Sequence, residues 1–244
     1  TCVTGFDRKR HSINRDQYGI YKFNIISNTW KLIFKYPPEF EPYYHQICYD
    51  QKQNIVFLLE EHKQQISIID LNNNEISTYT TYMMTGQGAV LLMVQDECHI
   101  LLGDCSKCHY KWNSKLKDLE EIFEFDQFDE GLSHHGVIYI ESKNKLLLFG
   151  GYFDEECMND IWEFDIQTNK WRLTEFKLPS KMCDFGWILT KNERYLIILG
   201  GEDEEEDDVR FKNIFVLNLD DMKFMESSVK LPKEDSFTAV SYTH

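Results

Sequence analysis

The chain has 244 residues, of which 42% are hydrophobic and 14% aromatic, so it can bury a substantial core in one large domain or two small ones. Its net charge of −15, from 41 acidic and 26 basic side chains, argues against nucleic-acid binding, because affinity for phosphate rests on clustered Lys and Arg. No apolar run approaches the roughly 20 residues that span a bilayer, which argues against a membrane protein.

The cysteines are scattered and odd in number, whereas a secreted disulfide framework would be denser and more regular. They are Cys2, Cys48, Cys98, Cys105, Cys108, Cys157 and Cys183. The sequence also has no N-x-S/T acceptor site. We therefore expect reduced thiols in an intracellular, cytoplasmic protein. Because the chain begins at Thr1 rather than Met, we interpret it as a fragment of a longer protein.

An apolar run that closes on small or acidic residues recurs along the chain. The runs end at Gly5, Glu60, Gly103, Gly150 and Gly200, in steps of 55, 43, 47 and 50 residues. A regular step of this size is typical of repeat architectures.

A short polar turn recurs in step with these runs, with Asn or Asp six residues before an apolar residue. The pairs are Asn24/Trp30, Asp70/Ile76, Asn113/Leu119, Asp165/Trp171 and Asn218/Phe224. Asn and Asp suit tight turns because they bond to their own chain or tolerate left-handed backbone. The flanking runs, rich in Ile, Val, Phe, Tyr and Trp, are typical of strands, and helical spacing is nowhere sustained. The sequence predicts an all-β repeat protein.

Two of the repeats carry a family resemblance. The segment 145–179, "KLLLFGGYFDEECMNDIWEFDIQTNKWRLTEFKLP", resembles a kelch repeat in its double glycine, variable loop and late Trp. Segment 194–232 is similar, with Phe224 in place of the Trp, and the three earlier repeats are degenerate. The resemblance implies one β-propeller domain over 1–244, built from four-stranded antiparallel blades. The repeats cover roughly 1–35, 43–81, 86–126, 134–179 and 183–232, about five blade equivalents.

The resemblance also implies which residues are structural. Glycine at the end of a second strand allows close backbone approach or a positive φ, and large aromatic residues fill the gaps between blades. The residues in these roles are Gly150, Gly151, Gly200, Gly201, Trp30, Trp162, Trp171 and Phe224.

The ends of the chain leave two arrangements open. Residues 236–244 supply a first strand with no blade after it, while the repeat at Gly5 lacks one. Either a six- or seven-bladed ring is truncated at both ends, or 237–242 completes the blade begun by residues 2–5. The usual size of the family favours truncation, so we expect further blades or domains in the full-length chain.

Loop length varies only between the second and third strands, on the face from which the chain also passes to the next blade. Function is carried disproportionately by loops on a rigid scaffold, so this face is the expected binding surface for a protein or peptide partner. Two charge clusters on it are candidate contacts, although solvated mobile loops would have the same composition. They are Arg8, Lys9, Arg10 and Arg15 in one loop and Asp203, Glu204, Glu205, Glu206 and Arg210 in another.

Catalysis finds little support in the motifs, and we expect no cofactor, no metal and no enzymatic activity. Kelch-type propellers resemble the catalytic ring of galactose oxidase, which binds copper, so an enzyme or metal protein of that type is the alternative. Its candidate ligands are Tyr43, Tyr44, His45, His134 and His135, but no motif of that enzyme matches residue by residue. The acidic loop lacks the spaced ligands of a calcium site.

The stretch Cys105–His109 spells C-x-x-C-H, the spacing of c-type haem attachment or half of a zinc site. The repeat register instead places residues 108–112 in a third strand, with His109 in the column of Ile20, Ile66, Ile161 and Ile214. Trp112 falls in the column of Phe23, Ile69, Phe164 and Leu217. We therefore predict that His109 and Trp112 are packed in the core. An exposed His109 would contradict that register.

Overall fold

The computed structural model describes residues 2–3, 19–24, 26–37, 45–60, 64–82, 86–203 and 209–231, and this part of the chain is built from β-strands. It contains one 3-10 helix, Glu141–Lys143, and no α-helix. The first repeat contributes β1 (Cys2–Val3), β2 (Gly19–Asn24) and β3 (Thr29–Lys35). No helix in these ranges has the length and hydropathy needed to span a bilayer.

Each of the next four repeats forms a four-stranded antiparallel sheet. The second repeat has β4 (His45–Asp50), β5 (Ile55–Glu60), β6 (Gln65–Asp70) and β7 (Glu75–Thr80). The third has β8 (Val90–Val94), β9 (Glu97–Leu101), β10 (Cys108–Asn113) and β11 (Asp118–Glu124). The fourth has β12 (Gly136–Ile140), β13 (Lys145–Phe149), β16 (Asp160–Asp165) and β17 (Lys170–Lys177). The fifth has β18 (Gly186–Leu189), β19 (Tyr195–Leu199), β22 (Ile214–Asn218) and β23 (Lys223–Glu226).

Two short hairpins interrupt the last two sheets between their second and third strands. We call β14 (Tyr152–Phe153) with β15 (Glu156–Cys157) the fourth-repeat hairpin, and β20 (Glu202–Asp203) with β21 (Val209–Arg210) the fifth-repeat hairpin. Both lie where the sequence shows the variable loops.

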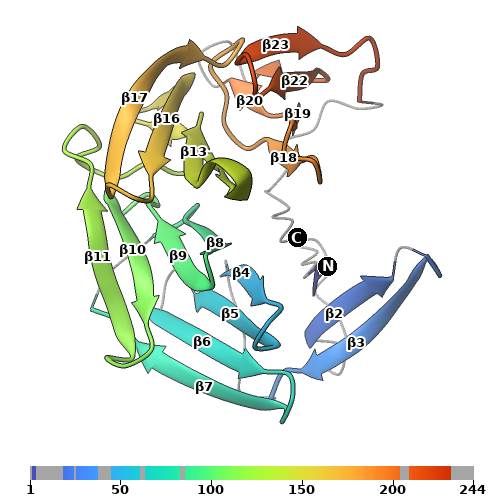
Figure 1. The fold of residues 1–244 in the computed structure, drawn as a ribbon, viewed down its shortest axis with the longest axis vertical. Coiled ribbons are helices and arrows are strands. Elements are labelled where there is room, and N and C mark those ends of the chain that lie inside the picture. The colour runs from blue at the N-terminus through green and yellow to red at the C-terminus, as the bar shows by residue number, and fades with distance from the viewer. Residues whose placement is uncertain are drawn as a thin grey trace.

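The sheets are arranged around a ring, each as one blade of a propeller (Figure 1). Within each four-stranded blade the strands follow chain order, from the inner first strand to the outer fourth strand (Figure 1). The predicted all-β propeller fold is therefore confirmed. The segment 236–244, predicted to be a first strand, lies outside the described residues, and the number of blades in the full ring stays a prediction.

The polar turns between third and fourth strands share one geometry in all five repeats. The side chain of the recurring Asn or Asp accepts a hydrogen bond from the amide two residues on, at 2.8 to 3.0 Å. Four residues after it, the backbone turns left-handed, with φ between 50° and 58°. The residues at that place are Asn28, Asn74, Lys117, Asn169 and Met222. The periodic Asn and Asp of the sequence therefore close the outer hairpin of every blade.

The double glycines adopt the conformation that the sequence predicts. Gly150 and Gly151 have φ of 60° and 107°, and Gly200 and Gly201 have φ of 64° and 97°. A Cβ on Gly150 would lie 2.7 Å from the ring of Phe185 and 2.8 Å from the carbonyl oxygen of Met182. Glycine is therefore required both by φ and by the close approach of the chain that enters the next blade.

Aromatic side chains join neighbouring blades, as predicted for Trp171. The Trp171 ring, on β17, packs 5.2 Å from Phe125 and 5.9 Å from His109, both from the preceding repeat. Trp162 and Phe224 are half-buried against the same apolar cluster, which runs through the third, fourth and fifth repeats. Separate clusters join the first repeat to the second and the second to the third.

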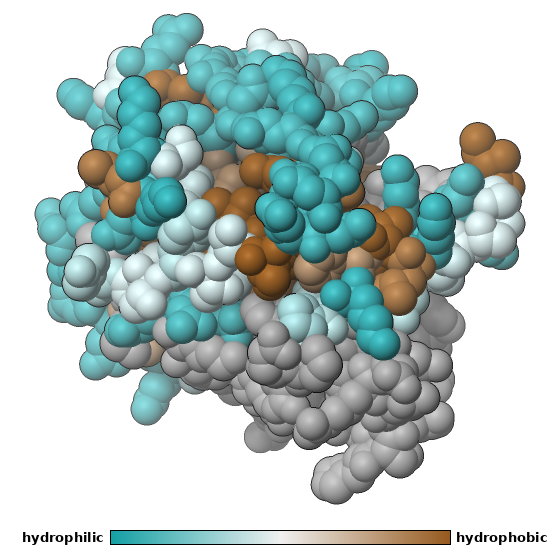
Figure 2. Space-filling view, turned by 90° about the horizontal axis from the view of Figure 1, so that it is seen from below, coloured by the Kyte–Doolittle hydropathy of each residue, from teal (hydrophilic) through white to brown (hydrophobic). Residues whose placement is uncertain are grey.

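The prediction for Trp30 is wrong. Trp30 is 54% exposed, although it occupies the place in β3 that Trp171 occupies in β17. Trp171 is buried because it lies against the preceding blade, whereas no buried cluster in the described ranges joins the first repeat to a sheet before it. The neighbouring Ile26 and Leu32 are exposed as well. Figure 2 shows hydrophobic atoms at the projection on the right, where the turn between β2 and β3 lies in Figure 1.

Replacing Asp165 with Ala should destabilise the fourth blade. Its carboxylate accepts hydrogen bonds from the amides of Gln167 and Thr168, at 2.9 and 3.1 Å. We expect a loss of about 1 kcal/mol in the free energy of unfolding, or roughly 2–4 °C in melting temperature. Urea and thermal unfolding measure it. Asp165→Asn is the matched control, because Asn fills this place in three other repeats. An Asp165→Ala variant as stable as the control would contradict the role given to this turn.

Candidate functional site

The loops between second and third strands and the connections to the next blade emerge on one face of the ring. We call this the loop face; its described segments are 36–37, 64, 81–82, 86–89, 102–107, 125–135, 150–159, 178–185, 200–203, 209–213 and 227–231. Since strands alternate direction within each blade, both kinds of segment necessarily share this side. The opposite face carries the turns between first and second and between third and fourth strands.

Two hairpins project from the loop face on firm backbone anchors. In the fourth-repeat hairpin the turn residues Asp154 and Glu155 have φ of 51° and 63°, the pattern of a type I′ turn. Its strand β14 is bonded to the segment that enters its own blade, through Ser133 and Tyr152, at 3.1 and 2.8 Å. The fifth-repeat hairpin is bonded in the same way through Cys183 and Glu202, with both bonds at 3.0 Å.

Acidic side chains collect on the loop face in successive repeats. They are Asp104, Asp126, Asp129, Glu130, Asp154, Glu155, Glu156, Asp184, Glu202 and Asp203, all exposed or half-buried. The basic residues of these segments are fewer: Lys107, Lys181, Arg210, Lys212 and Lys230. Lys107 and Lys181 pair with Glu124 and Glu156 at 2.9 and 2.8 Å. Carboxylates therefore dominate the described part of this face.

Two carboxylates on the opposite face, Asp96 and Glu193, make contacts between blades. Lys52 of the second repeat contacts Asp96 of the third at 2.6 Å. Glu193 of the fifth repeat accepts the backbone amides of Glu141 and Ser142 of the fourth, at 3.0 and 2.9 Å. These contacts act between neighbouring repeats, so Asp96 and Glu193 contribute to assembly of the ring.

At the inner edge of the loop face, equivalent residues of two blades contact each other. Nδ1 of His134 lies 2.6 Å from a carboxylate oxygen of Asp184. Both residues enter a first strand with left-handed backbone, at φ of 54° and 50°. The pair becomes an ion pair when His134 is protonated, and both side chains remain partly exposed.

The predicted partner-binding residues lie mostly outside the described residues. These are Arg8, Lys9, Arg10, Arg15, Glu204, Glu205 and Glu206. Asp203 ends β20 on the loop face, half-buried, and Arg210 ends β21 opposite Glu202. The structure therefore places the two ends of the acidic loop on the fifth-repeat hairpin, and the proposed binding role of these residues stays a prediction.

The residues considered as copper ligands are not gathered in the described part of the chain. Tyr43 and Tyr44 lie outside the described residues, and only the backbone of His45 is described. His135 is buried, and neither of its ring nitrogens makes a hydrogen bond within the described ranges. No three His, Cys, Asp or Glu side chains in those ranges are placed to hold a metal ion.

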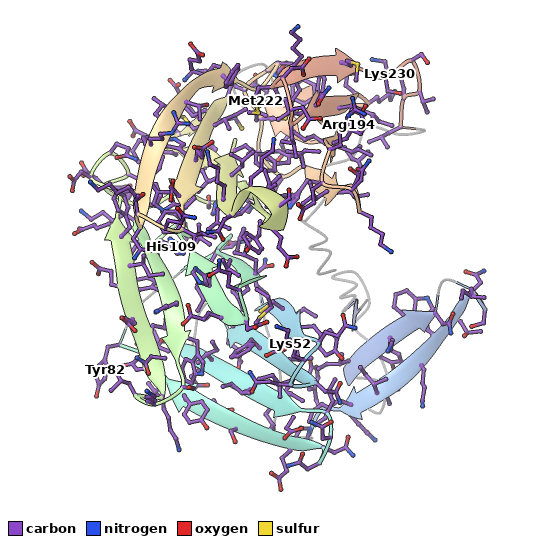
Figure 3. All side chains as sticks on the ribbon, in the orientation of Figure 1. Lys52, Tyr82, His109, Arg194, Met222 and Lys230 are labelled. Carbon is purple, nitrogen blue, oxygen red and sulfur yellow. The ribbon has the colours of Figure 1, made fainter. Side chains whose placement is uncertain are left out.

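His109 is packed in the core, as the repeat register predicts. It is 0% exposed, at the junction of the third and fourth blades (Figure 3). Trp112 is buried as well, while Cys105 is exposed and Cys108 begins β10. The C-x-x-C-H stretch is therefore a short loop that runs into the third strand.

The environment of His109 contains two partners that the sequence did not reveal. Trp171 Nε1 donates to His109 Nδ1 at 3.3 Å, and the other ring nitrogen lies 2.8 Å from Nδ1 of His99. Because the indole can only donate, neutral His109 carries its proton on Nε2 and donates it to His99. Burial lowers the pKa of both histidines, that of His99 to about 4 with a smaller contribution from Lys111.

The arrangement of blades, inner first strands and loop hairpins defines the chain as a β-propeller protein. Residues 141–174 match the kelch motif, a range that contains β13, the fourth-repeat hairpin and β16. The resemblance to kelch repeats is thus confirmed. No curated protein gives a significant match to the chain.

Replacing Trp171 with Phe should weaken the junction between the third and fourth blades. An aromatic ring stays in place, but the buried His109 loses its indole donor. We expect a loss of about 1–2 kcal/mol in the free energy of unfolding, measured with urea. Trp30→Phe is the matched control at the equivalent, exposed place, and it should change stability by less than about 0.5 kcal/mol. Equal effects of the two variants would contradict the junction described above.

His135 should make the protein sensitive to acid. Burial, with a smaller effect of His134, lowers the pKa of His135 to about 3, against 6.5 for an exposed histidine. Between pH 6.5 and 3 the unfolded chain binds this proton and the folded chain does not, so stability falls as the pH falls. His135→Phe, which copies Phe185 at the equivalent place, should lower this slope by up to about 1.4 kcal/mol per pH unit. Urea unfolding at pH 7, 6 and 5 measures the slope. An unchanged slope would show that His135 is protonated in the folded chain.

Proposed function

We propose that the chain is a non-catalytic interaction scaffold that presents its loop face to a protein or peptide partner. Adaptor and cytoskeleton-associated modules are the roles we favour, in the cytoplasm. The kelch motif and the propeller fold support a scaffold of this kind.

The observation that carries the proposal is the difference in charge between the two faces. Carboxylates on the loop face come from successive repeats and outnumber its basic residues, whereas Asp96 and Glu193 on the opposite face make contacts between blades. An excess of solvated carboxylates attracts a basic partner over distances of about 10 Å at ordinary salt. We therefore expect a partner segment rich in Lys and Arg.

The hairpins give such a partner a pre-organised contact. The type I′ turn holds Asp154, Glu155 and Glu156 at the tip of the fourth-repeat hairpin, and the Ser133–Tyr152 bonds fix its base. Less conformational entropy is lost on binding when the contacting residues are already fixed. The fifth-repeat hairpin carries Glu202 and Asp203, and the Glu202 carbonyl lies 3.4 Å from Sγ of Cys157 in the fourth-repeat hairpin.

The alternative was a propeller enzyme or metal protein of the galactose-oxidase type. His134 contacts Asp184, and the Cβ position of Gly151 lies 2.7 Å from Cβ of His135. These contacts support structural roles for both histidines. Elemental analysis of the purified chain tests the alternative directly, since bound copper at one ion per chain would support it.

Selection of peptides from a displayed random library tests the proposed scaffold role. We expect binders enriched in Lys and Arg, whose affinity falls as salt is raised. The test variant is Asp154→Asn/Glu155→Gln/Glu156→Gln, which should lower the affinity about tenfold, measured by fluorescence anisotropy. Deletion of 203–208 tests the fifth-repeat loop in the same assay.

The matched control removes three carboxylates from the opposite face: Glu75→Gln/Glu141→Gln/Asp221→Asn. It has the same net charge as the test variant, so a general effect of charge would weaken both equally. An equal loss of affinity for both variants, or an affinity that neither variant changes, would refute the assignment of the loop face.

A further inference from the structure

Two buried thiols meet at the base of the loop-face hairpins. Sγ of Cys157, at the end of β15, lies 2.7 Å from Sγ of Cys183, in the segment that enters the fifth blade. Cys157 is 0% exposed and Cys183 2%. The chain has another buried thiol pair, Cys48 and Cys98, but their sulfur atoms are 3.4 Å apart. A disulfide requires about 2.05 Å, so Cys157 and Cys183 are the pair nearest to that geometry.

The backbone on both sides of the two cysteines is held in place. The amide of Met182 donates to the carbonyl of Met158 at 3.1 Å, which joins the residues adjacent to Cys183 and Cys157. Cys183 also exchanges two backbone bonds with Glu202. Both thiols additionally point to the Glu202 carbonyl, at 3.4 Å from Cys157 and 3.8 Å from Cys183. While the hairpin is closed, the sulfur atoms therefore stay close to each other.

The fold does not need a thiol at this place. In the preceding blade Ser133 occupies the position of Cys183 and makes the same pair of backbone bonds, to Tyr152. Ser133 is buried as Cys183 is. Because a serine makes the same backbone bonds at the equivalent position, the thiol of Cys183 is not required for packing. The two thiols are therefore available for a reaction with each other.

We propose that Cys157 and Cys183 form a reversible disulfide that fixes the fourth-repeat hairpin to the segment entering the fifth blade. The oxidant is a small disulfide of the glutathione type. One protein thiolate attacks it, breaks its S–S bond and releases one glutathione. The second protein thiol then loses its proton and displaces the second glutathione. Two protein S–H bonds and one S–S bond are lost, and one protein S–S bond and two glutathione S–H bonds are formed.

Access to the thiols requires opening of the hairpin. The hydrogen bond from Cys157, together with burial, raises the pKa of the Cys183 thiol, so the closed hairpin reacts slowly. β14 and β15 share only two residue pairs, Tyr152 with Cys157 and Phe153 with Glu156, and Glu156 is exposed. Short elements of this kind open locally at low free energy. The reaction rate therefore follows hairpin opening, and closure brings the second thiol into contact with the first.

Peptide mapping of the full chain tests the proposal. The chain is incubated with oxidised glutathione at pH 8, with and without mild urea, then alkylated and digested with trypsin without reduction. We expect the peptide 146–170 joined to 182–191, with a mass two hydrogens below the sum of the two free peptides. Dithiothreitol should restore both free thiols.

Two variants sharpen the result. Cys183→Ser, which copies Ser133 of the preceding blade, should lose the cross-linked peptide while keeping the melting temperature within about 3 °C of the reduced chain. Cys48→Ser is the matched control and should still form the cross-linked peptide. Hydrogen exchange should show slower exchange of the hairpin amides, by about tenfold, in the oxidised chain only.

Other outcomes would overturn the proposal. These are the absence of the 146–170/182–191 cross-link under both conditions, stable glutathione adducts on Cys157 or Cys183, or cross-links confined to Cys48, Cys98 or Cys105. Each readout is covalent and independent of partner binding, so its failure would leave the proposed scaffold role standing.

Discussion

Packing of apolar side chains between neighbouring blades is the interaction on which the propeller depends. Trp171 covers Phe125 and His109, and the apolar cluster around it continues through the third, fourth and fifth repeats. Removing a buried ring of this size costs about 3–5 kcal/mol, against about 1 kcal/mol for a single hydrogen bond. Packing between blades therefore outweighs any single turn or surface ion pair in positioning the repeats.

This rigid base determines what the loop face can do. The hairpins are bonded at their bases to the segments that enter the blades, while Asp154, Glu155 and Glu156 of the fourth-repeat hairpin are exposed. The sequence of a loop can then vary without disturbing the packing between blades, because the loops project from one face while the packed side chains lie between the sheets. The pair Cys157 and Cys183 lies at the boundary between these two regions, where the base of a hairpin contacts the segment that enters the next blade.

The features predictable from the sequence were those set by local chemistry and by period. Asn or Asp at each outer turn predicted the strands on both sides, and the double glycines predicted left-handed backbone. The place of His109 followed from its column of isoleucines, since a position that is apolar in four repeats is expected to be buried in the remaining one.

Features that depend on a neighbouring blade were not predictable. Trp30 has the local sequence of Trp171, but no buried cluster of the described residues covers it. His99 meets His109 diagonally across two strands, a relation that appears only once the register of β9 and β10 is known. Cys157 and Cys183 belong to different repeats and meet only through the chain that enters the fifth blade. The acidic tip at Asp154–Glu156 was visible in the sequence, but its relation to the fifth-repeat hairpin was not.

The repeated Asn and Asp turns have a consequence for the order of folding. Each closes a hairpin between strands adjacent in sequence, and such local contacts form within about 1–10 μs. Contacts between blades join residues farther apart, such as His109 and Trp171, and must bear the entropy of closing longer loops. We therefore expect the blades to acquire their outer hairpins early, and the docking of these hairpins onto one another to be the slow step of folding.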